Sequence, residues 1–282
     1  MKLALFNGNR LGVVCGAADD KIVDVTAALP AWDDGFAANW WLRLCHDFSA
    51  LRPAIEAAQS GQSVLLASVK LNAPALCPGK IIAAAANYPA HVAEMISVGT
   101  FPTWMGEFGL FLKAPSSIIG PDETIALPET DGAEIHHESE LAFVIGKEGK
   151  AIPEAQAMDY VLGYTGLLDM TIRGQGDRSW RKSYDGFTPM GPWLVTADEI
   201  ADPHNLRIRL WVNDEAQPRQ DVLTRDMGVK IPEMIARASQ AMTLYPGDVI
   251  TTGAPPGVGK ITAGDSMAME IERIGRMVIH TH

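Results

Sequence analysis

The chain has 282 residues, enough for one large domain or for a small domain followed by a larger one. Its content of 47% hydrophobic and 20% charged residues is typical of a folded globular protein and excludes a disordered chain. The net charge of −11 argues against nucleic acid or an anionic membrane as a partner, because both require a basic surface.

The cysteines and the N-terminal residues indicate where in the cell the protein is expected. Cys15, Cys45 and Cys77 form no CxxC pair, so they predict neither a zinc site nor a disulfide framework. The first apolar stretch is too short for a signal peptide, and no apolar run approaches the roughly 20 residues that span a bilayer. The sequence therefore predicts a cytoplasmic protein with no membrane partner.

The first 75 residues predict a small α+β domain. Three short apolar segments before residue 26, separated by turn residues, predict a β-meander, and a helical stretch that ends at Gly61 follows it. Two prolines and a glycine between Leu71 and Lys80 predict an extended crossing. We therefore expect two domains, at residues 1–75 and 76–282.

The larger segment predicts a fold that is mainly β. Residues 81–86 predict a buried strand, and Pro89 begins a helix that carries His91 and Glu94. Between Met95 and Gly109, glycines, a proline and aromatic residues without periodicity are typical of a mobile lid. Helices do not alternate with strands as a doubly wound sheet requires, so the expected class is α+β, mainly β.

Two glutamates lie at the start of one predicted strand. Residues 136–146 predict a strand because their second half is apolar, β-branched and aromatic and ends at a glycine. Glu138 and Glu140 would then face the same side, with Cα atoms roughly 6.5 to 7 Å apart. Such a pair is often a solvated strand end, but here it leads into a buried strand. That position favours a cation between the carboxylates, and hard oxygen ligands suit Mg²⁺, Mn²⁺ or Ca²⁺.

A third carboxylate, Asp169, directly follows the predicted strand at residues 161–168. Together with the two glutamates it would supply three oxygen ligands from two strands and leave metal positions for water and a chelating substrate. Three carboxylates with one divalent cation keep a net negative charge, so a small anionic substrate needs further cations nearby. The candidates are Arg173, Arg178, Arg181 and Lys182, and the alternative for each arginine is a solvated loop.

His91 and Glu94 are three residues apart, so they share a helix face and can form a hydrogen bond. A carboxylate that orients an imidazole raises its basicity, which makes the pair a competent general base for water. An isolated pair of this kind is more often an ordinary exposed helix pair.

Two nearby motifs do not predict binding sites. The loop at residues 252–260 lacks the P-loop pattern, because Ala254 stands where a glycine is required and Ile261 where a serine or threonine is required. His136 and His137 precede the paired glutamates, but strand alternation turns His137 away from them, and we expect neither histidine to be a ligand.

Six motifs occur in the order found in the fumarylacetoacetate hydrolase superfamily, which the sequence therefore resembles from about Lys80 to the C-terminus. The motifs are Asn87-Tyr88-x-x-His91-x-x-Glu94, Phe111-Leu112-Lys113, His137-Glu138-Ser139-Glu140-Leu141, Asp169-Met170-Thr171-Ile172-Arg173, Lys182-Ser183-Tyr184-Asp185-Gly186-Phe187 and Thr252-Gly253-Ala254-Pro255-Pro256-Gly257-Val258-Gly259. Two departures, alanines at 83–86 and a short loop between Asp169 and Lys182, bear on the substrate end of the site and not on the metal.

The resemblance implies a mixed β-sheet roll, usually a homodimer, with the three carboxylates as metal ligands. It also implies that His91 and Glu94 activate water under a lid. Lys182 is the third expected catalytic residue. The expected substrate contacts are Tyr88, Arg173, Thr252 and Gly253.

The expected function is that of a Mg²⁺- or Mn²⁺-dependent hydrolase, with Ca²⁺ as a further option. It would cleave a carbon–carbon bond in a 2,4-dioxo acid of the acylpyruvate or fumarylpyruvate type through a metal-stabilised enolate, with Lys182 stabilising the developing oxyanion. The same chemistry serves a 2-oxo-diacid decarboxylase of the oxaloacetate type or a 2-hydroxy-diene-dioate isomerase, and both remain alternatives. A relative that binds metal without turnover would be expected to lack the dyad or a carboxylate, and neither is missing here.

Overall fold

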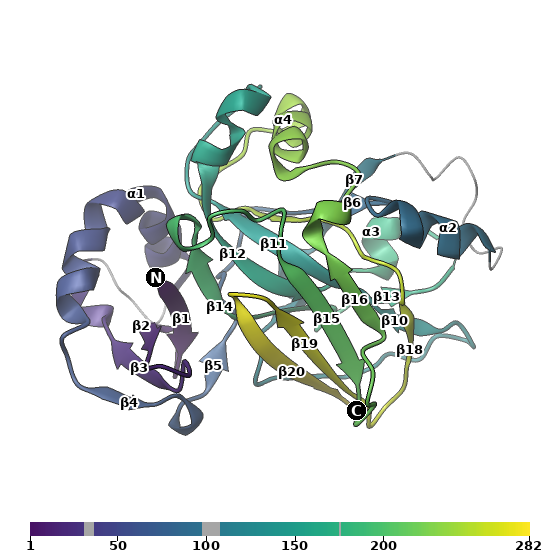
Figure 1. Cartoon of the computed structure of the whole chain (residues 1–282), viewed down its shortest axis with the longest axis horizontal. Coiled ribbons are helices and arrows are strands. Elements are labelled where there is room, and N and C mark those ends of the chain that lie inside the picture. Colours follow the sequence, from purple (N-terminus) through teal and green to yellow (C-terminus); the bar gives the residue numbers. More distant parts are fainter. Residues whose placement is uncertain (31–36, 98–107, 175) are drawn as a thin grey trace.

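The computed structural model describes all residues except 31–36, 98–107 and 175 (Figure 1). The described residues form a 12-stranded, a five-stranded and a three-stranded sheet with few helices. The predicted α+β, mainly β class is thereby confirmed. None of the described helices combines the length and the hydropathy that a bilayer-spanning segment requires.

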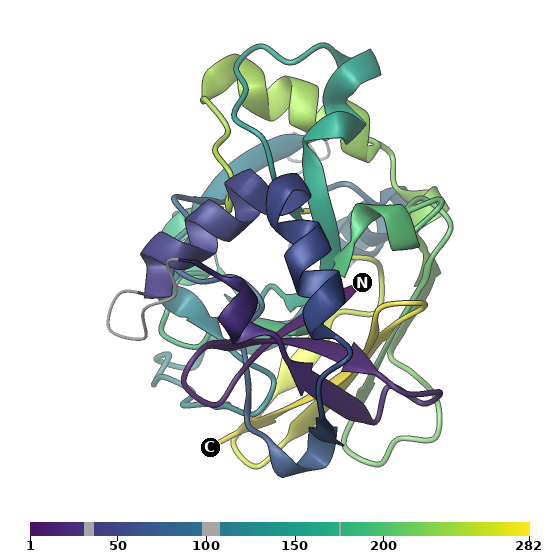
Figure 2. The same ribbon diagram turned by 90° about the vertical axis from the view of Figure 1, so that its left-hand side faces the viewer.

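The N-terminal strands continue the largest sheet. β1 pairs antiparallel with β14, where Leu3 lies opposite Leu194. The helix α1 lies beside these strands (Figure 2). Its buried Trp40 and Trp41 belong to the same hydrophobic cluster as Leu3 and Leu5 of β1. Strands from both sides of the domain boundary expected near residue 75 share one sheet. The boundary itself stays a prediction. The elements of this part are β1 (Lys2–Phe6), β2 (Arg10–Cys15), β3 (Lys21–Asp24), η1 (Thr26–Ala28), α1 (Ala37–Ala58), β4 (Ser63–Leu65), η2 (Leu66–Ser68) and β5 (Leu71–Asn72).

The central strands of the large sheet are covered on both faces. Every residue of β11 is buried, and alternate side chains enter two different hydrophobic clusters: Leu141 and Phe143 in one, Ala142 and Val144 in the other. This explains the continuous apolar sequence of the strand. The order after β1 is β14-β12-β11-β17-β6-β7. These strands are β6 (Ile81–Ala85), β7 (Gly109–Lys113), β11 (Ser139–Ile145), β12 (Val161–Leu168), β14 (Thr188–Thr196) and β17 (Val249–Thr251).

The two smaller sheets complete the roll. The five-stranded sheet has the order β16-β15-β19-β20-β9, and the three-stranded sheet has the order β13-β10-β18. β5 pairs with β1, and β8 pairs with β14. The strands not yet given are β8 (Ile118–Ile119), β9 (Thr124–Ile125), β10 (Ile135–His137), β13 (Thr171–Ile172), β15 (Arg207–Val212), β16 (Gln220–Leu223), β18 (Gly259–Ile261), β19 (Ser266–Ile271) and β20 (Gly275–Thr281).

Some local predictions need correction. The strand predicted at residues 136–146 is interrupted at Glu138, because β10 and β11 belong to different sheets. Residues Glu154–Tyr160 form a 3₁₀ helix, η5. The predicted lid falls mainly on residues 98–107, outside the described residues, while residues 95–97 end α2. The remaining helices are α2 (Pro89–Ser97), η4 (Pro115–Ser117), η5 (Glu154–Tyr160), α3 (Arg178–Arg181), η6 (Ala197–Glu199), η7 (Thr224–Asp226) and α4 (Ile231–Ala241).

Candidate active site

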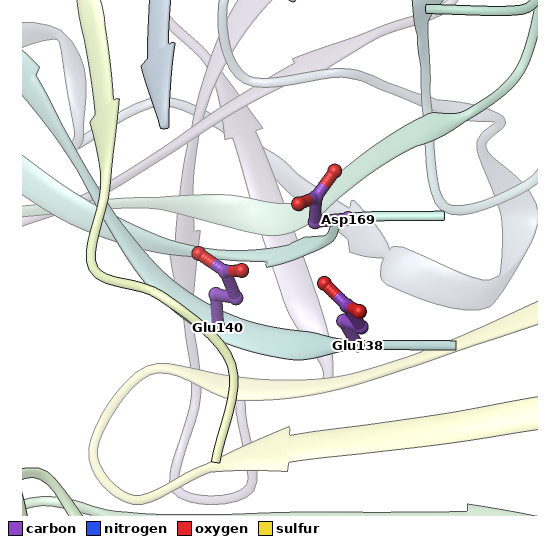
Figure 3. A group of neighbouring side chains, drawn as sticks. All are labelled: Glu138, Glu140 and Asp169. Carbon is purple, nitrogen blue, oxygen red and sulfur yellow. The ribbon is translucent and has the colours of Figure 1, made fainter. Parts of the chain in front are cut away.

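The antiparallel pairing of β11 with β12 brings three carboxylates together. Ser139 lies opposite Leu168, so Glu138 and Asp169 sit at adjacent strand ends, where the Asp169 N–H donates to the Glu138 carbonyl oxygen at 2.8 Å. Glu140 is two residues along β11 and faces the same side. The three residues are buried, and one oxygen from each lies within 4.8 Å of the others (Figure 3). The structure thus gathers the three predicted metal ligands at one point.

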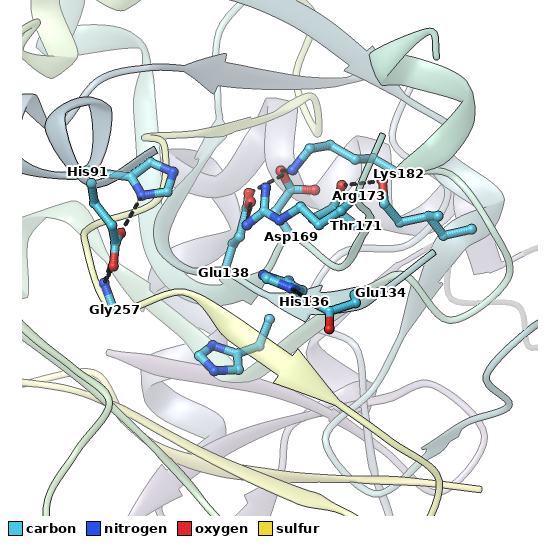
Figure 4. A network of polar contacts seen from close by, with 12 residues as sticks. His91, Glu134, His136, Glu138, Asp169, Thr171, Arg173, Lys182 and Gly257 are labelled. Carbon is cyan, nitrogen blue, oxygen red and sulfur yellow. Dashed lines mark hydrogen bonds and ion pairs between the residues drawn. The ribbon is translucent and has the colours of Figure 1, made fainter. Parts of the chain in front are cut away.

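Three cations surround this acidic cluster. Lys182 Nζ donates to Glu138 Oε2 and to Asp169 Oδ2, both at 2.6 Å (Figure 4). Lys113 Nζ donates to Asp169 Oδ1 and, at 3.0 Å, to a backbone carbonyl oxygen. Arg173 Nη2 lies 2.9 Å from Glu138 Oε1. Lys182 and Arg173 were expected near the substrate, and the structure places both against Glu138.

The charges affect the two glutamates differently. Burial alone would raise the pKa of Glu138, but Lys182 and Arg173 outweigh burial and hold that pKa well below its usual range. Burial and the neighbouring charge of Asp169 raise the pKa of Glu140 above its usual range, although a hydrogen bond from Thr251 opposes the shift. Glu140 is therefore the carboxylate whose negative charge the protein compensates least.

The oxygens of Glu140 provide a test of whether a metal ion fits. Oε2 accepts hydrogen bonds from the Thr251 hydroxyl and, at 2.7 Å, from the Gly253 N–H. Oε1 is buried without a hydrogen-bond partner among the described residues. A buried carboxylate oxygen without a partner is costly, and a hard cation is a suitable partner for it. The donor set of the cluster therefore fits a divalent cation.

The expected His91–Glu94 pair forms on α2. His91 is buried, and its Nδ1 lies 3.1 Å from Glu94 Oε2 (Figure 4). Burial acts to raise the pKa of Glu94, but hydrogen bonds from His91 and Gly257 lower it below its usual value. Glu94 is therefore ionised at neutral pH and able to orient the imidazole. His91 lies within electrostatic range of Glu138, so the pair is close to the acidic cluster (Figure 4).

A glycine in the loop that precedes β18 holds this pair in place. The Gly257 N–H donates to both Glu94 oxygens, at 3.0 and 3.2 Å. Gly257 has φ +89°, and a Cβ atom there would lie 1.9 Å from the Arg219 carbonyl oxygen. Only glycine fits this backbone without a shift. The loop thus anchors the carboxylate of the dyad.

The expected substrate contacts differ in their surroundings. The Tyr88 hydroxyl is buried without a hydrogen-bond partner among the described residues, and burial raises its pKa. The Thr252 N–H and hydroxyl both donate to the Leu141 carbonyl oxygen, at 3.0 and 2.9 Å. Gly253 bonds Glu140 through its backbone. Contact of these residues with a substrate stays a prediction.

Two residues of the site received no role from the sequence. Lys113 ends an apolar strand of sequence Gly-Leu-Phe-Leu-Lys, and a lone lysine closing such a strand was the available signal. Thr251, next to the expected Thr252, carries the hydroxyl that bonds Glu140. His137, which we did not expect to be a ligand, is buried with its Nδ1 3.3 Å from Gln220 Oε1.

Comparison with known proteins adds an independent view of this site. A family model described as "Fumarylacetoacetate (FAA) hydrolase C-terminal" matches residues 80–280. A maleylpyruvate hydrolase of Aquipseudomonas alcaligenes is 43% identical over 290 residues, which cover 99% of this chain and 98% of the relative. A mitochondrial oxaloacetate tautomerase of Xenopus laevis is 43% identical over 242 residues, covering 80% of this chain and 73% of the relative. The crystal structure of maleylpyruvate hydrolase from Sphingobium sp. SYK-6, in complex with manganese(II) and pyruvate, superposes with a TM-score of 0.88 at 45% identity and covers 100% of this chain and 98% of that one.

Proposed function

This chain belongs to the fumarylacetoacetate hydrolase family, and from that premise we propose that it is a metal-dependent hydrolase of acylpyruvates. Acylpyruvates are 2,4-dioxo acids, and the proposed reaction cleaves the bond between C3 and C4. The observation that carries the proposal is the buried three-carboxylate cluster beside the His91–Glu94 pair. The similarity to maleylpyruvate hydrolases over nearly the whole chain supports it.

We assign Glu138, Glu140 and Asp169 as the ligands of the metal, and Mg²⁺ or Mn²⁺ as the ion. The manganese in the related crystal structure supports this choice. These three residues would hold the cation, which would supply Lewis-acid stabilisation to the 2-oxo acid end of the substrate and to the enolate charge that develops there.

The protein's own residues would move the protons. Glu94 holds His91 through Nδ1, which leaves Nε2 to accept a proton from water. The water oxygen adds to the C4 carbonyl, and the Lys182 ammonium donates to the developing oxyanion. The C3–C4 bond then breaks with its electron pair on C3, which takes the proton held by His91 to give pyruvate, while the acyl group leaves as a carboxylic acid.

Further assignments are part of the same proposal. Tyr88 supplies a hydrogen-bond donor to the substrate, and its unpaired hydroxyl supports this role. Arg173 faces the substrate beside Glu138, and Thr252 and Gly253 border the site next to Glu140. We also propose a homodimer, as the family resemblance implies. The cytoplasmic location remains a prediction, supported by three free cysteines.

Hydrolysis of acetylpyruvate and maleylpyruvate with added Mg²⁺ or Mn²⁺ tests the function. We expect turnover that a chelator abolishes, with pyruvate as a product. Oxaloacetate should be assayed in parallel for decarboxylation and tautomerisation, because one relative is an oxaloacetate tautomerase. Turnover of oxaloacetate without turnover of either acylpyruvate would contradict the proposal.

A further inference from the structure

Two arginines lie one helical turn apart on α3. Arg178 and Arg181 are half-buried and separated by three residues, so they share one face of the helix. Arg181 Nη1 donates to the Thr171 hydroxyl at 2.8 Å and to the Ile172 carbonyl oxygen at 3.1 Å. These bonds fix α3 against β13. Arg178 instead stacks near Phe111, with Cζ 5.4 Å from the ring centroid.

The ring of Phe111 links Arg178 to the acidic cluster. Lys182 Nζ, which bonds Glu138 and Asp169, lies 5.6 Å from the same ring centroid. Lys182, which bonds the cluster, and Arg178 on α3 thus both lie against the ring of Phe111. A ligand complementary to this arrangement carries two anionic ends joined by a hydrocarbon segment.

The charge balance favours the same kind of ligand. Arg173, Lys113 and Lys182 form ion pairs with the cluster, whereas neither arginine of α3 forms an ion pair with a carboxylate among the described residues. Burial lowers the pKa of both α3 arginines, and the charges of the cluster oppose that shift, so the guanidiniums lie within its field. A divalent cation would offset two of the three carboxylate charges and leave the site with surplus positive charge.

We propose that Arg178, on a helix fixed by Arg181, binds a second carboxylate at the acyl end of the substrate. This inference rests on the proposed function and narrows its substrate class to acylpyruvates with a terminal carboxylate. Phe111 presents an apolar surface beside both cations, which suits the hydrocarbon segment of a four-carbon acyl group. The planar guanidinium matches a carboxylate with two parallel hydrogen bonds.

The variant Arg178→Gln tests the proposal with two substrates. We expect kcat/KM for maleylpyruvate to fall on the order of 10- to 100-fold, mainly through KM, because a charge-assisted hydrogen-bond pair is lost. Acetylpyruvate has no second carboxylate, so its kcat/KM should stay within about threefold. Arg178→Lys keeps the positive charge but not the paired donors of the guanidinium, so its kcat/KM for maleylpyruvate should fall less than that of Arg178→Gln. In metal-free protein, calorimetric titration with maleate should give weaker binding for Arg178→Gln than for wild type.

Arg276→Gln is the matched control, because Arg276 Cζ lies 5.4 Å from the Trp211 ring centroid in another part of the molecule. It should leave both substrates unchanged. Equal losses on both substrates in Arg178→Gln, or no loss on maleylpyruvate, would overturn the role of Arg178 and leave the proposed function standing. A wild-type protein that hydrolyses neither acylpyruvate would overturn both.

Discussion

The two oxygens of the Glu140 carboxylate have very different surroundings. One accepts two hydrogen bonds, from Thr251 and Gly253, while the other is buried without a partner among the described residues. The hydrogen bonds fix the direction of the carboxylate and leave the remaining oxygen available to a cation. In the proposed metal site, the protein orients Glu140 and a bound cation would be the missing partner of its second oxygen.

Removal of this carboxylate should weaken metal binding directly. We expect Glu140→Ala to lower the affinity for Mg²⁺ or Mn²⁺ by at least about 100-fold, because one of three protein ligands is lost. Calorimetric titration of the metal-free protein measures the change. Glu148→Gln, on an exposed residue, serves as the control and should bind as wild type does. Unchanged affinity in Glu140→Ala would contradict the ligand assignment.

His91 separates water activation from metal binding. We expect His91→Ala to lower kcat for acylpyruvate hydrolysis by on the order of 10² to 10⁴, the usual worth of a positioned general base. Metal affinity should barely change. Glu94→Gln should cause a milder loss, and the double variant should be little worse than His91→Ala, because the pair acts as one unit.

A matched histidine–carboxylate pair lies on α1, where His46 Nδ1 is 2.6 Å from Asp47 Oδ1 on the exposed surface. His46→Ala should leave hydrolysis unchanged. Hydrolysis by His91→Ala within a few-fold of wild type would mean that another group accepts the proton.

The loop before β18 holds the Glu94 side chain of α2 through the backbone N–H of Gly257. Gly257→Ala would place a methyl group against the Arg219 carbonyl oxygen, so the loop must move and its hydrogen bonds to Glu94 weaken. We expect kcat to fall about tenfold, toward the value for Glu94→Gln. Gly264→Ala is the matched control, since Gly264 has φ +92° but open space around it. Gly264→Ala should lose roughly 1 kcal/mol of stability in thermal unfolding and no activity, whereas Gly257→Ala should lose more stability because of the clash and should also lose activity.

Local periodicity predicted much of this site. Alternation along a strand was enough to bring Glu138 and Glu140 to one side, and helical spacing was enough to pair His91 with Glu94. The interruption of the strand at Glu138 was not predictable, because it depends on pairing of β10 with β13 and β18, distant in the chain. The role of Lys113 was hidden for the same reason, since its partner Asp169 is 56 residues away.

The pairing of β1 with β14 joins residues 1–75 to the rest of the large sheet, so the stability of the molecule depends on both parts of the chain. Residues 1–75 complete a sheet edge and one hydrophobic cluster that also contains Leu194 and Val249. We expect a protein truncated to residues 76–282 to expose this edge and these apolar side chains, and therefore to aggregate or unfold at lower temperature. Size-exclusion chromatography and thermal unfolding would measure both effects. A monodisperse, active 76–282 fragment would instead establish an independent catalytic domain.

The strand that carries the carboxylates supplies side chains to both hydrophobic clusters, while the edge strand β7 and the short helix α3 carry Phe111 and Arg178. Substitutions in β11 disturb two cores at once, whereas Phe111 and Arg178 belong to neither cluster. If Arg178 binds the acyl end as proposed, substitutions at Phe111 and Arg178 could change the substrate without disturbing the strand that carries the carboxylates. Such a division would allow related chains to act on different substrates, and the relatives include proteins named for hydrolysis of maleylpyruvate and for tautomerisation of oxaloacetate.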